Sequence, residues 1–255
     1  MKVISFHLKG KMAHFRKFYS NSSALSYFIP PRTTVCGMIA GLMGIERDEY
    51  YEDFSLDKCK IAIASCRPIK KTMQKMNYLK VESVTKDLNG SQEYHSQTPM
   101  ELIIPQNIRN SYVDYKIWIY HTEKNIMDEI EKIFMERQID YYTSLGTSIA
   151  LGSAFNLGWI DGIEILEGKE INEVGEEIFS SAIPLEKVQE IKVDKMLEGR
   201  YRILKEEIPL EFNLEREITP NGLKDVLVNI NSKSIPARVN SFVKLENEEN
   251  IVWLE

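Results

Sequence analysis

The order of periodic segments constrains the fold of this chain more than any other feature. Segments with the alternation of strands and segments with the 3.6-residue period of helices follow one another as strand, helix, strand, long hairpin, strand, helix, strand. This is the order of a ferredoxin-like unit, so we expect an α+β domain with the hairpin inserted as an arm. The predicted segments are residues 1–8, 31–42, 58–67, about 68–104, 112–121, 124–138 and 155–165.

The predicted arm at about 68–104 is polar and too long for a plain turn. Its Asn89-Gly90 pair is the strongest two-residue hairpin signal in the chain. The base of the arm carries Lys70, Lys71 and Lys75 beside Met76. A basic arm with an apolar side chain suits insertion between the unstacked bases of single-stranded RNA. The alternative is a solvated arm that touches a neighbouring protein.

Residues 166–255 form a second, smaller section of acidic composition. Short alternating runs predict that it is rich in strands, with turns at Asn221-Gly222 and Pro236. We therefore expect two units, a ferredoxin-like domain at 1–165 and a β-rich section at 166–255. The strand at 112–121 presents Tyr112 and Trp118 on its second face, which could stack bases in an open RNA-recognition sheet. We expect another layer to cover that face.

Residues 14–44 pack basic, aromatic, hydroxyl and glycine residues more densely than any other stretch. The first half lacks a period and predicts a loop rich in hydrogen-bond donors, which we expect to fold against the helix that follows and to form a phosphate pocket with it. Pro30-Pro31 then predict the start of a helix, whose first turn with Arg32 and Thr33 suits an anion such as phosphate. Gly37 lies inside that helix, where glycine costs about 1 kcal/mol, so we expect another backbone to lie close to it.

Charge is distributed unevenly along the chain. The net charge of 255 residues is −6, yet residues 1–80 hold 14 lysines and arginines against six acidic residues, a net of +8, and 81–255 carry −14. No acidic residue precedes Glu46. A basic face on an acidic body is typical of proteins that bind a polyanion, and the interleaved aromatic residues favour nucleic acid over a merely solvated surface.

Several classes of site are not supported by the residue spacing. Three cysteines and four scattered histidines lack the paired spacing of a zinc site, and we expect neither metal nor cofactor. The glycine-rich stretch that contains Gly146 lacks the spacing and the lysine of a nucleotide-binding P-loop. The longest apolar windows are shorter than the roughly 20 residues of a membrane span, and no signal region is present, so we expect a cytoplasmic protein.

The run FRKFYSNSSALSYFIPPRTTVCGMIAGLMGIERDEYY resembles the amino-terminal signature of the CRISPR-associated Cas-five family, in particular its type I-B (Hmari) subtype, within the RAMP group. The resemblance implies an RRM-type, ferredoxin-like fold that caps the 5′ handle of the crRNA in an antiviral type I Cascade complex. Its partners there would be the backbone (RAMP) subunits, the large subunit and, indirectly, target DNA. The family's thumb implies that the arm inserts into the guide RNA.

The residues expected to contact RNA come from the leader, the helix start, the arm and the glycine-rich stretch. They are His14, Arg16, Lys17, Tyr19, Ser20, Asn21, Ser22, Ser23, Ser26, Tyr27, Arg32, Thr33, Lys70, Lys71, Lys75, Met76 and Gly146. We expect no catalytic residue. Two alternatives stay open: a metal-free endoribonuclease that processes precursor crRNA, with His14 or His121 as general base, and an assembly module that binds protein only.

Overall fold

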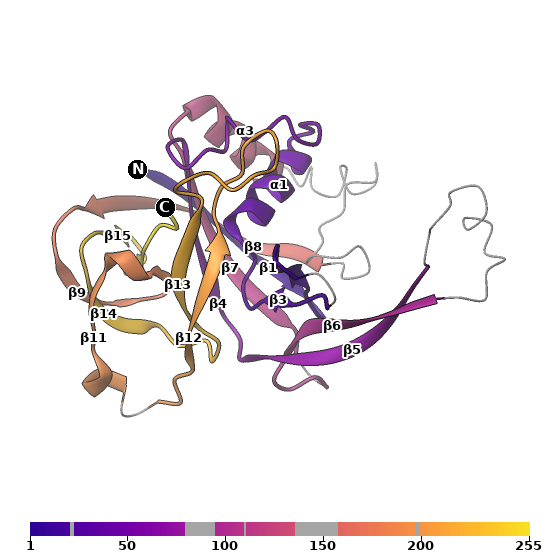
Figure 1. Ribbon diagram of the computed structural model, residues 1–255. Helices are drawn as coiled ribbons and strands as arrows, with labels where there is room; N and C mark the ends of the chain where they lie inside the picture. The colour runs from indigo at the N-terminus through magenta and orange to yellow at the C-terminus, as the bar shows by residue number, and fades with distance from the viewer. Residues whose placement is uncertain (21–22, 80–94, 110, 136–157, 197–198) are drawn as a thin grey trace.

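A ferredoxin-like sheet forms the centre of the computed structural model, which describes residues 1–20, 23–79, 95–109, 111–135, 158–196 and 199–255 (Figure 1). Its four strands have the order β8-β1-β7-β4, with antiparallel neighbours throughout. Each helix joins two parallel strands that are separated by one antiparallel strand, which is the split βαβ arrangement. The predicted order of elements is thereby confirmed. The bounds are β1 Lys2–Gly10, α1 Arg32–Leu42, β4 Cys59–Ser65, β7 Val113–His121, α3 Lys124–Met135 and β8 Gly158–Ile171.

Both described helices cover one face of this sheet. Ile39 of α1 and Ile130 of α3 are buried in the same cluster as Ile117 of β7. The rings of Phe6 and Phe134 lie 4.9 Å apart between sheet and α3. Burying each large apolar side chain contributes about 1.5–3 kcal/mol, so this layer fixes where the strands and helices lie. Among the described helices, none is long and apolar enough to cross a membrane.

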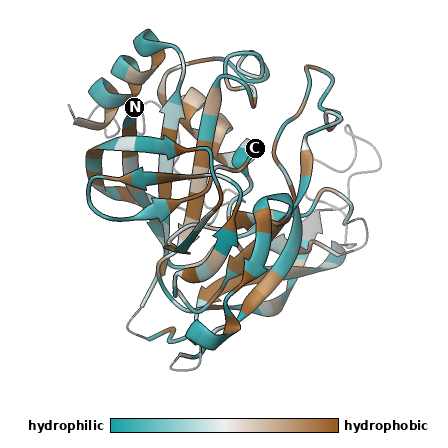
Figure 2. Ribbon diagram, turned by 90° about the vertical axis from the view of Figure 1, so that its left-hand side faces the viewer, coloured by the Kyte–Doolittle hydropathy of each residue, from teal (hydrophilic) through white to brown (hydrophobic). Residues whose placement is uncertain are grey.

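The second face of the sheet, which we expected another layer to cover, is covered at one end by the carboxyl-terminal section. Val3, Trp118 and Leu166 of the sheet pack there against Val243 and Trp253. The strands of the molecule carry both hydrophobic and hydrophilic residues (Figure 2). Its elements are β9 Gly175–Phe179, β10 Ile183–Pro184, η1 Leu185–Lys187, β11 Val188–Ile191, η2 Val193–Met196, β12 Ile203–Pro209, β13 Leu223–Asn229, β14 Ile235–Val239, β15 Phe242–Leu245 and β16 Asn250–Ile251.

Strand β8 joins the two parts of the chain into one mixed sheet. Its first half pairs with β1 and its last residues pair with β15, which gives the strand order β11-β14-β9-β16-β15-β8-β1-β7-β4. A smaller sheet has the order β10-β13-β12. The strand therefore runs straight through the predicted boundary at residues 165 and 166. Pro236, predicted in a turn, lies inside β14 instead, where its carbonyl oxygen accepts a hydrogen bond from Lys192 N at 3.0 Å.

A two-stranded arm projects from the opposite side of the body from β9, β14 and β15 (Figure 1). Its strands β5 Ile69–Leu79 and β6 His95–Pro105 are antiparallel and in register from Ile69↔Pro105 to Leu79↔His95. The predicted hairpin arm is thus confirmed in its strands. The predicted turn at Asn89-Gly90 lies outside the described residues.

Helix α1 begins at Arg32 after Pro31, as predicted. The close neighbour of Gly37 is a side chain and not the backbone that we expected. A Cβ built on Gly37 would lie 2.8 Å from Oη and 3.3 Å from Cζ of Tyr50. Glycine therefore makes room for a tyrosine ring from the segment that follows the helix.

Candidate nucleic-acid interface

Residues 11–29, which we call the leader, lie along the outer edge of strand β6. The N–H groups of Ala13 and Ile103 donate to each other's carbonyl oxygens at 2.9 and 2.8 Å. Further along, Ala24 N donates to the carbonyl of Pro99, and the N–H of Glu101 to the carbonyl of Ala24, both at 2.8 Å. These backbone bonds make the leader an additional edge of the arm. The leader lies beside the arm, whereas we had predicted a pocket between leader and helix α1.

The leader contains two short paired strands, β2 Phe15–Arg16 and β3 Ser26–Tyr27, where we expected an irregular loop. His14 is only 3% exposed, and its Nδ1 donates to the carbonyl of Glu101 at 2.7 Å. Burial lowers the pKa of His14 and keeps its ring neutral. Ser26 is buried as well, and its hydroxyl accepts from Phe15 N and donates to the carbonyl of Tyr27, both at 2.9 Å.

The turn between these strands is closed by its own polar groups. The hydroxyl of Ser20 donates to the carbonyl of Lys17 at 2.7 Å, and the guanidinium of Arg16 donates to the carbonyl of Ser20 at 3.0 Å. Tyr27 is fully buried, with Lys17 Nζ 5.2 Å from its ring centroid, and burial raises the pKa of its phenol. Stacking requires an exposed ring, so the predicted base contacts of His14 and Tyr27 are wrong. The predicted RNA contacts of Ser20 and Ser26 are wrong too, because both side chains are buried.

Two aromatic rings at the tip of the leader face outward. Phe18 and Tyr19 are 47% and 50% exposed, and their rings meet edge to face at 5.2 Å. Lys17 Nζ lies 5.7 Å from the centroid of Tyr19 and stabilises that ring by a cation–π contact. The sequence prediction included Tyr19 but omitted Phe18 from the contact residues.

Strand β5, which pairs with β6, adds exposed cations on both faces of the arm. Lys70 and Lys75 are exposed, as is Arg16 of the leader. Met73 is 51% exposed, whereas Met76 packs partly against the cluster around Met100. Met73 is thus the exposed methionine of the described arm, where we had named Met76. The region has the cations and flat rings that single-stranded nucleic acid requires.

Two predicted phosphate ligands are paired with carboxylates. Lys17 Nζ lies 3.4 Å from Glu206 of β12, while Lys71 Nζ lies 3.3 Å from Glu101 and 3.7 Å from Glu206. Glu206 is 6% exposed and also accepts from Phe28 N at 2.8 Å. These lysines consequently tie leader, arm and carboxyl-terminal section together. Sequence analysis missed Glu206. The signal was its position two residues before Ile208, which places both side chains on the inward face of β12.

Arg32 is placed in the core and not on a binding surface. It is 1% exposed and donates to the carbonyl oxygens of Leu210, Phe54, Ser55 and Cys59. A guanidinium that is enclosed by carbonyl groups cannot reach a phosphate at the surface, so this predicted contact is corrected. Of the other predicted residues, Ser23 and Thr33 are partly exposed, and Asn21, Ser22 and Gly146 lie outside the described residues.

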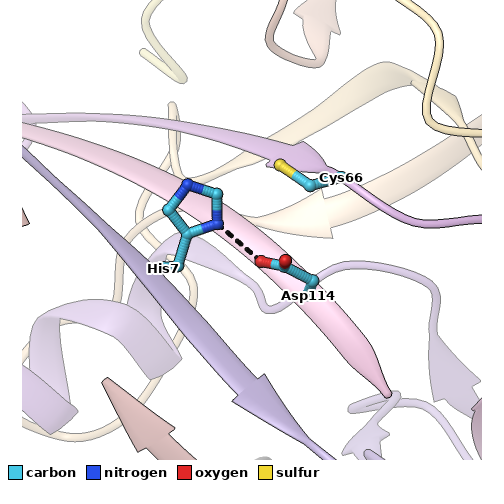
Figure 3. Close-up of side chains that lie close together, drawn as sticks. All are labelled: His7, Cys66 and Asp114. Atoms are coloured by element: carbon cyan, nitrogen blue, oxygen red, sulfur yellow. Dashed lines mark hydrogen bonds and ion pairs between the residues drawn. The ribbon is translucent and has the colours of Figure 1, made fainter. Parts of the chain in front are cut away.

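A second polar cluster lies on the uncovered end of the sheet's second face (Figure 3). His7, Cys66 and Asp114 each place one potential metal-ligand atom within 4.8 Å of the others. His7 Nδ1 and Asp114 Oδ1 are 2.6 Å apart, a hydrogen-bond distance, whereas two ligands of one tetrahedral zinc ion lie about 3.3 Å apart. Lys9 and Arg67 come within 3.9 and 3.8 Å of the same carboxylate.

This arrangement is that of a hydrogen-bonded His–Asp pair beside a protonated thiol. Burial raises the pKa of the Cys66 thiol to about 11, so the thiolate that metal binding requires is disfavoured. The carboxylate of Asp114 is already satisfied by His7 and by two nearby cations. The trio in its present geometry does not fit a metal centre.

Fold and surface together define a ferredoxin-like protein with a cationic and aromatic arm. Residues 3–111 match the sequence model of the family described as "CRISPR-associated protein (Cas_Cas5)". The match includes the leader, α1 and the arm, so this amino-terminal part of the chain is similar to the Cas5 family. This agrees with the predicted resemblance, whereas the type I-B subtype stays a prediction. None of the curated proteins matches the chain.

Solved structures resemble the chain over nearly its whole length. The "Crystal structure of a CRISPR protein from Archaeoglobus fulgidus" has a TM-score of 0.60 at 11% identity and covers 99% of each chain. A chain of a "CRISPR RNA-guided surveillance complex" has a TM-score of 0.48 at 10% identity, with 92% and 91% covered. A chain of the "Type III-B Cmr-beta bound to cognate target RNA and AMPPnP" has 0.44 at 12%, with 93% and 86% covered. The first similarity shows that the two chains share a fold.

Proposed function

We propose that this protein is a non-catalytic crRNA-binding subunit of a type I surveillance complex, of subtype I-B, that caps the 5′ handle of the guide RNA. Its partners there are the backbone and large subunits and, indirectly, target DNA. One observation carries the proposal. The leader holds Phe18 and Tyr19 outward beside β6, while the paired strand β5 presents Lys70 and Lys75.

The chemistry of this surface suits single-stranded RNA. Exposed cations attract the phosphate backbone, and exposed rings accept unstacked bases. Because backbone hydrogen bonds hold the leader on the arm, the rings and the cations stay in fixed register before RNA arrives. The residues that match the Cas5 family model include both elements, which supports the same assignment.

The two histidines that we considered as general bases support binding without cleavage. Cleavage without a metal requires a general base within hydrogen-bond reach of the ribose 2′-OH. The two candidates, His14 and His121, are both buried. His121 uses both ring nitrogens, since Nε2 donates to the carbonyl of Asp53 at 2.7 Å and Nδ1 accepts from Glu123 N at 3.0 Å.

The test is incubation of the purified protein with labelled RNA that carries the CRISPR repeat of the same genome. Retention of intact RNA supports the proposal. Discrete fragments would instead support the endoribonuclease, and an absence of retention at low salt would support the protein-only assembly module.

A pair of double variants localises the contact. Lys70→Ala with Lys75→Ala removes two cations from the arm, and Lys169→Ala with Lys244→Ala removes two exposed cations from the paired strands β8 and β15. Each phosphate contact contributes about 0.7 to the slope of log K against log salt for single strands, so the arm variant should lower that slope by about 1.4. The control should leave it unchanged. Equal effects of both variants would contradict an interface on the arm.

A further inference from the structure

At the end of the sheet's second face that the described carboxyl-terminal section does not cover, one tryptophan ring is exposed. Trp159 of β8 is 39% exposed, whereas Trp118 and Trp253 at the covered end are 1% and 2% exposed. Trp159 pairs with Lys9 across β1 and β8, so the two side chains share the face. We call Trp159, Tyr112, Arg67 and Lys9 the shelf.

The rings of the shelf are held in place by a cation and by hydrogen bonds. The guanidinium of Arg67 lies 3.9 Å from the ring centroid of Tyr112, and that ring lies 5.6 Å from Trp159. Arg67 also donates to the hydroxyls of Tyr112 at 2.8 Å and Ser111 at 3.3 Å. Lys9 Nζ lies 5.6 Å from the Tyr112 centroid on the same face. Because Tyr112 is fixed in this way and contacts the exposed ring of Trp159, the pair offers a stacking surface that needs little ordering when a ligand binds.

His7 supplies a polar group next to these rings. Its Nδ1–H donates to Asp114, which leaves Nε2 as the remaining hydrogen-bonding atom of the ring. Gly162, at φ +59°, lets β8 pass close by, because a Cβ there would lie 3.0 Å from Cδ2 of His7. The absence of a side chain at position 162 thus leaves room for the imidazole of His7 beside β8.

The shelf lies where the arm joins the sheet. Arg67 is in the segment that leads from β4 to β5, and Tyr112 immediately precedes β7 in the segment that returns from β6. The two connections between sheet and arm therefore meet in the stacked pair of Arg67 and Tyr112. A single-stranded RNA that is bound along the arm reaches the shelf if it continues toward the central sheet.

We propose that the shelf is a stacking platform for an unpaired base of the same single-stranded RNA that the arm and the leader hold. This inference rests on the proposed function and extends it to a second contact at the base of the arm. Flat rings with an adjacent guanidinium are a sequence-tolerant platform for bases. A stable protein interface buries about 800 Å² a side around an apolar centre, whereas here Lys9 and Arg67 lie against the ring of Tyr112 and Lys9 is also paired with Asp161.

The intrinsic fluorescence of the protein tests this platform directly. Since the other two tryptophans are buried, quenching by added RNA reports on Trp159. The probe is a short repeat-derived RNA extended by oligouridine and labelled with fluorescein at its 3′ end, so that anisotropy measures affinity independently. Stacking of one base is worth about 1–3 kcal/mol, so Trp159→Ala should weaken binding about 5- to 150-fold. Trp159→Phe keeps a ring and should bind within about threefold of the wild type.

The outcomes separate this inference from the proposed function. Quenching together with the loss in Trp159→Ala supports the shelf. If RNA binds but neither quenches the emission nor distinguishes Trp159→Ala from Trp159→Phe, the shelf is overturned while the function stands. If only a partner protein quenches the emission, the shelf is a protein contact and the inference is wrong. If no RNA binds to any variant at low salt, the function and the inference fail together.

Discussion

Arg32 donates from Nη1 to the carbonyl oxygen of Leu210 at 2.8 Å, across 178 residues of chain. Its Nη2 donates to the carbonyls of Phe54 and Ser55 at 2.9 Å and also to Cys59. One buried guanidinium thus joins the first turn of α1, the segment before β4 and the segment after β12. Arg32 holds together the body that carries the arm, and it does so from within the core.

We predict that Arg32→Ala destabilises the protein without a specific effect on RNA. The substitution leaves buried carbonyl groups without a donor, at about 1–3 kcal/mol each, so the free energy of unfolding should fall by at least about 3 kcal/mol. Urea denaturation measures that loss. Arg47→Ala, at a position after α1 where the side chain is 79% exposed, is the control and should change stability by less than about 0.5 kcal/mol. A stable Arg32→Ala protein that no longer binds RNA would contradict this role and restore the phosphate site.

Gly37 and Tyr50 should show energetic coupling in a double-mutant cycle. Alanine at position 37 gains about 1 kcal/mol of helix propensity, but its Cβ would lie 2.8 Å from Oη of Tyr50. We expect Gly37→Ala to be destabilising in the wild type. In the Tyr50→Phe background the nearest remaining atom is Cζ at 3.3 Å, so the same change should be less costly or stabilising. Thermal denaturation of the four proteins gives the coupling, and additive effects would show that the hydroxyl is not the obstacle.

Sequence analysis predicted the central elements because their period agrees with their burial. In α3, for example, Ile126, Ile130 and Ile133 recur with the helical period, and the structure buries all three while most charged residues between them are exposed. The leader was harder, because β2 and β3 have two residues each, too few to establish a period. Those short strands are held by bonds to Pro99, Glu101 and Ile103 of the arm, which no local pattern reveals.

The candidate site was predicted in composition but not in exposure. His14, Tyr27 and Arg32 are residue types that bind RNA on a surface, yet each is buried here by a partner distant in the sequence. Arg32 illustrates the reason. Its acceptors are backbone carbonyls, and because every residue has one, no residue type in the sequence marks the partners of Arg32. Glu206 did leave a trace, since it shares the inward phase of β12 with Ile208, and a charge at an inward position indicates a buried partner.

The buried histidine of the leader should make stability depend on pH. Burial holds the pKa of His14 below the ordinary value of 6.5, so in acid the unfolded chain takes up a proton before the folded protein does. Its contribution to stability is complete above about pH 6.5 and is lost as the pH falls toward the folded-state pKa, by at most about 1.4 kcal/mol per pH unit. His14→Asn keeps a donor for the carbonyl of Glu101 but cannot titrate.

Urea denaturation between about pH 7.5 and 5.5 should therefore show a steeper loss for the wild type than for His14→Asn. The difference between the two proteins removes the contribution of every other titrating group. Parallel pH profiles would show that the His14 ring is protonated as readily in the folded protein as in the unfolded chain.

Removing the charge of Glu206 should separate its structural role from its electrostatic one. Glu206→Gln deprives Lys17 and Lys71 of their shared carboxylate, so we expect a loss of about 2 kcal/mol in the free energy of unfolding. RNA affinity should move in the opposite direction, because two lysines of the leader and arm lose a competing anion. One unit charge about 6 Å from a phosphate in water is worth about 0.7 kcal/mol, or about threefold tighter binding at low salt.

Glu207→Gln is the matched control, because the neighbouring carboxylate points outward from the same strand and carries the same charge. It should change neither stability nor affinity measurably. If both variants tighten RNA binding equally, the effect comes from net charge and not from release of Lys17 and Lys71. If Glu206→Gln instead weakens binding in the folded protein, the ion pairs position the leader for RNA, and the two lysines act through that geometry.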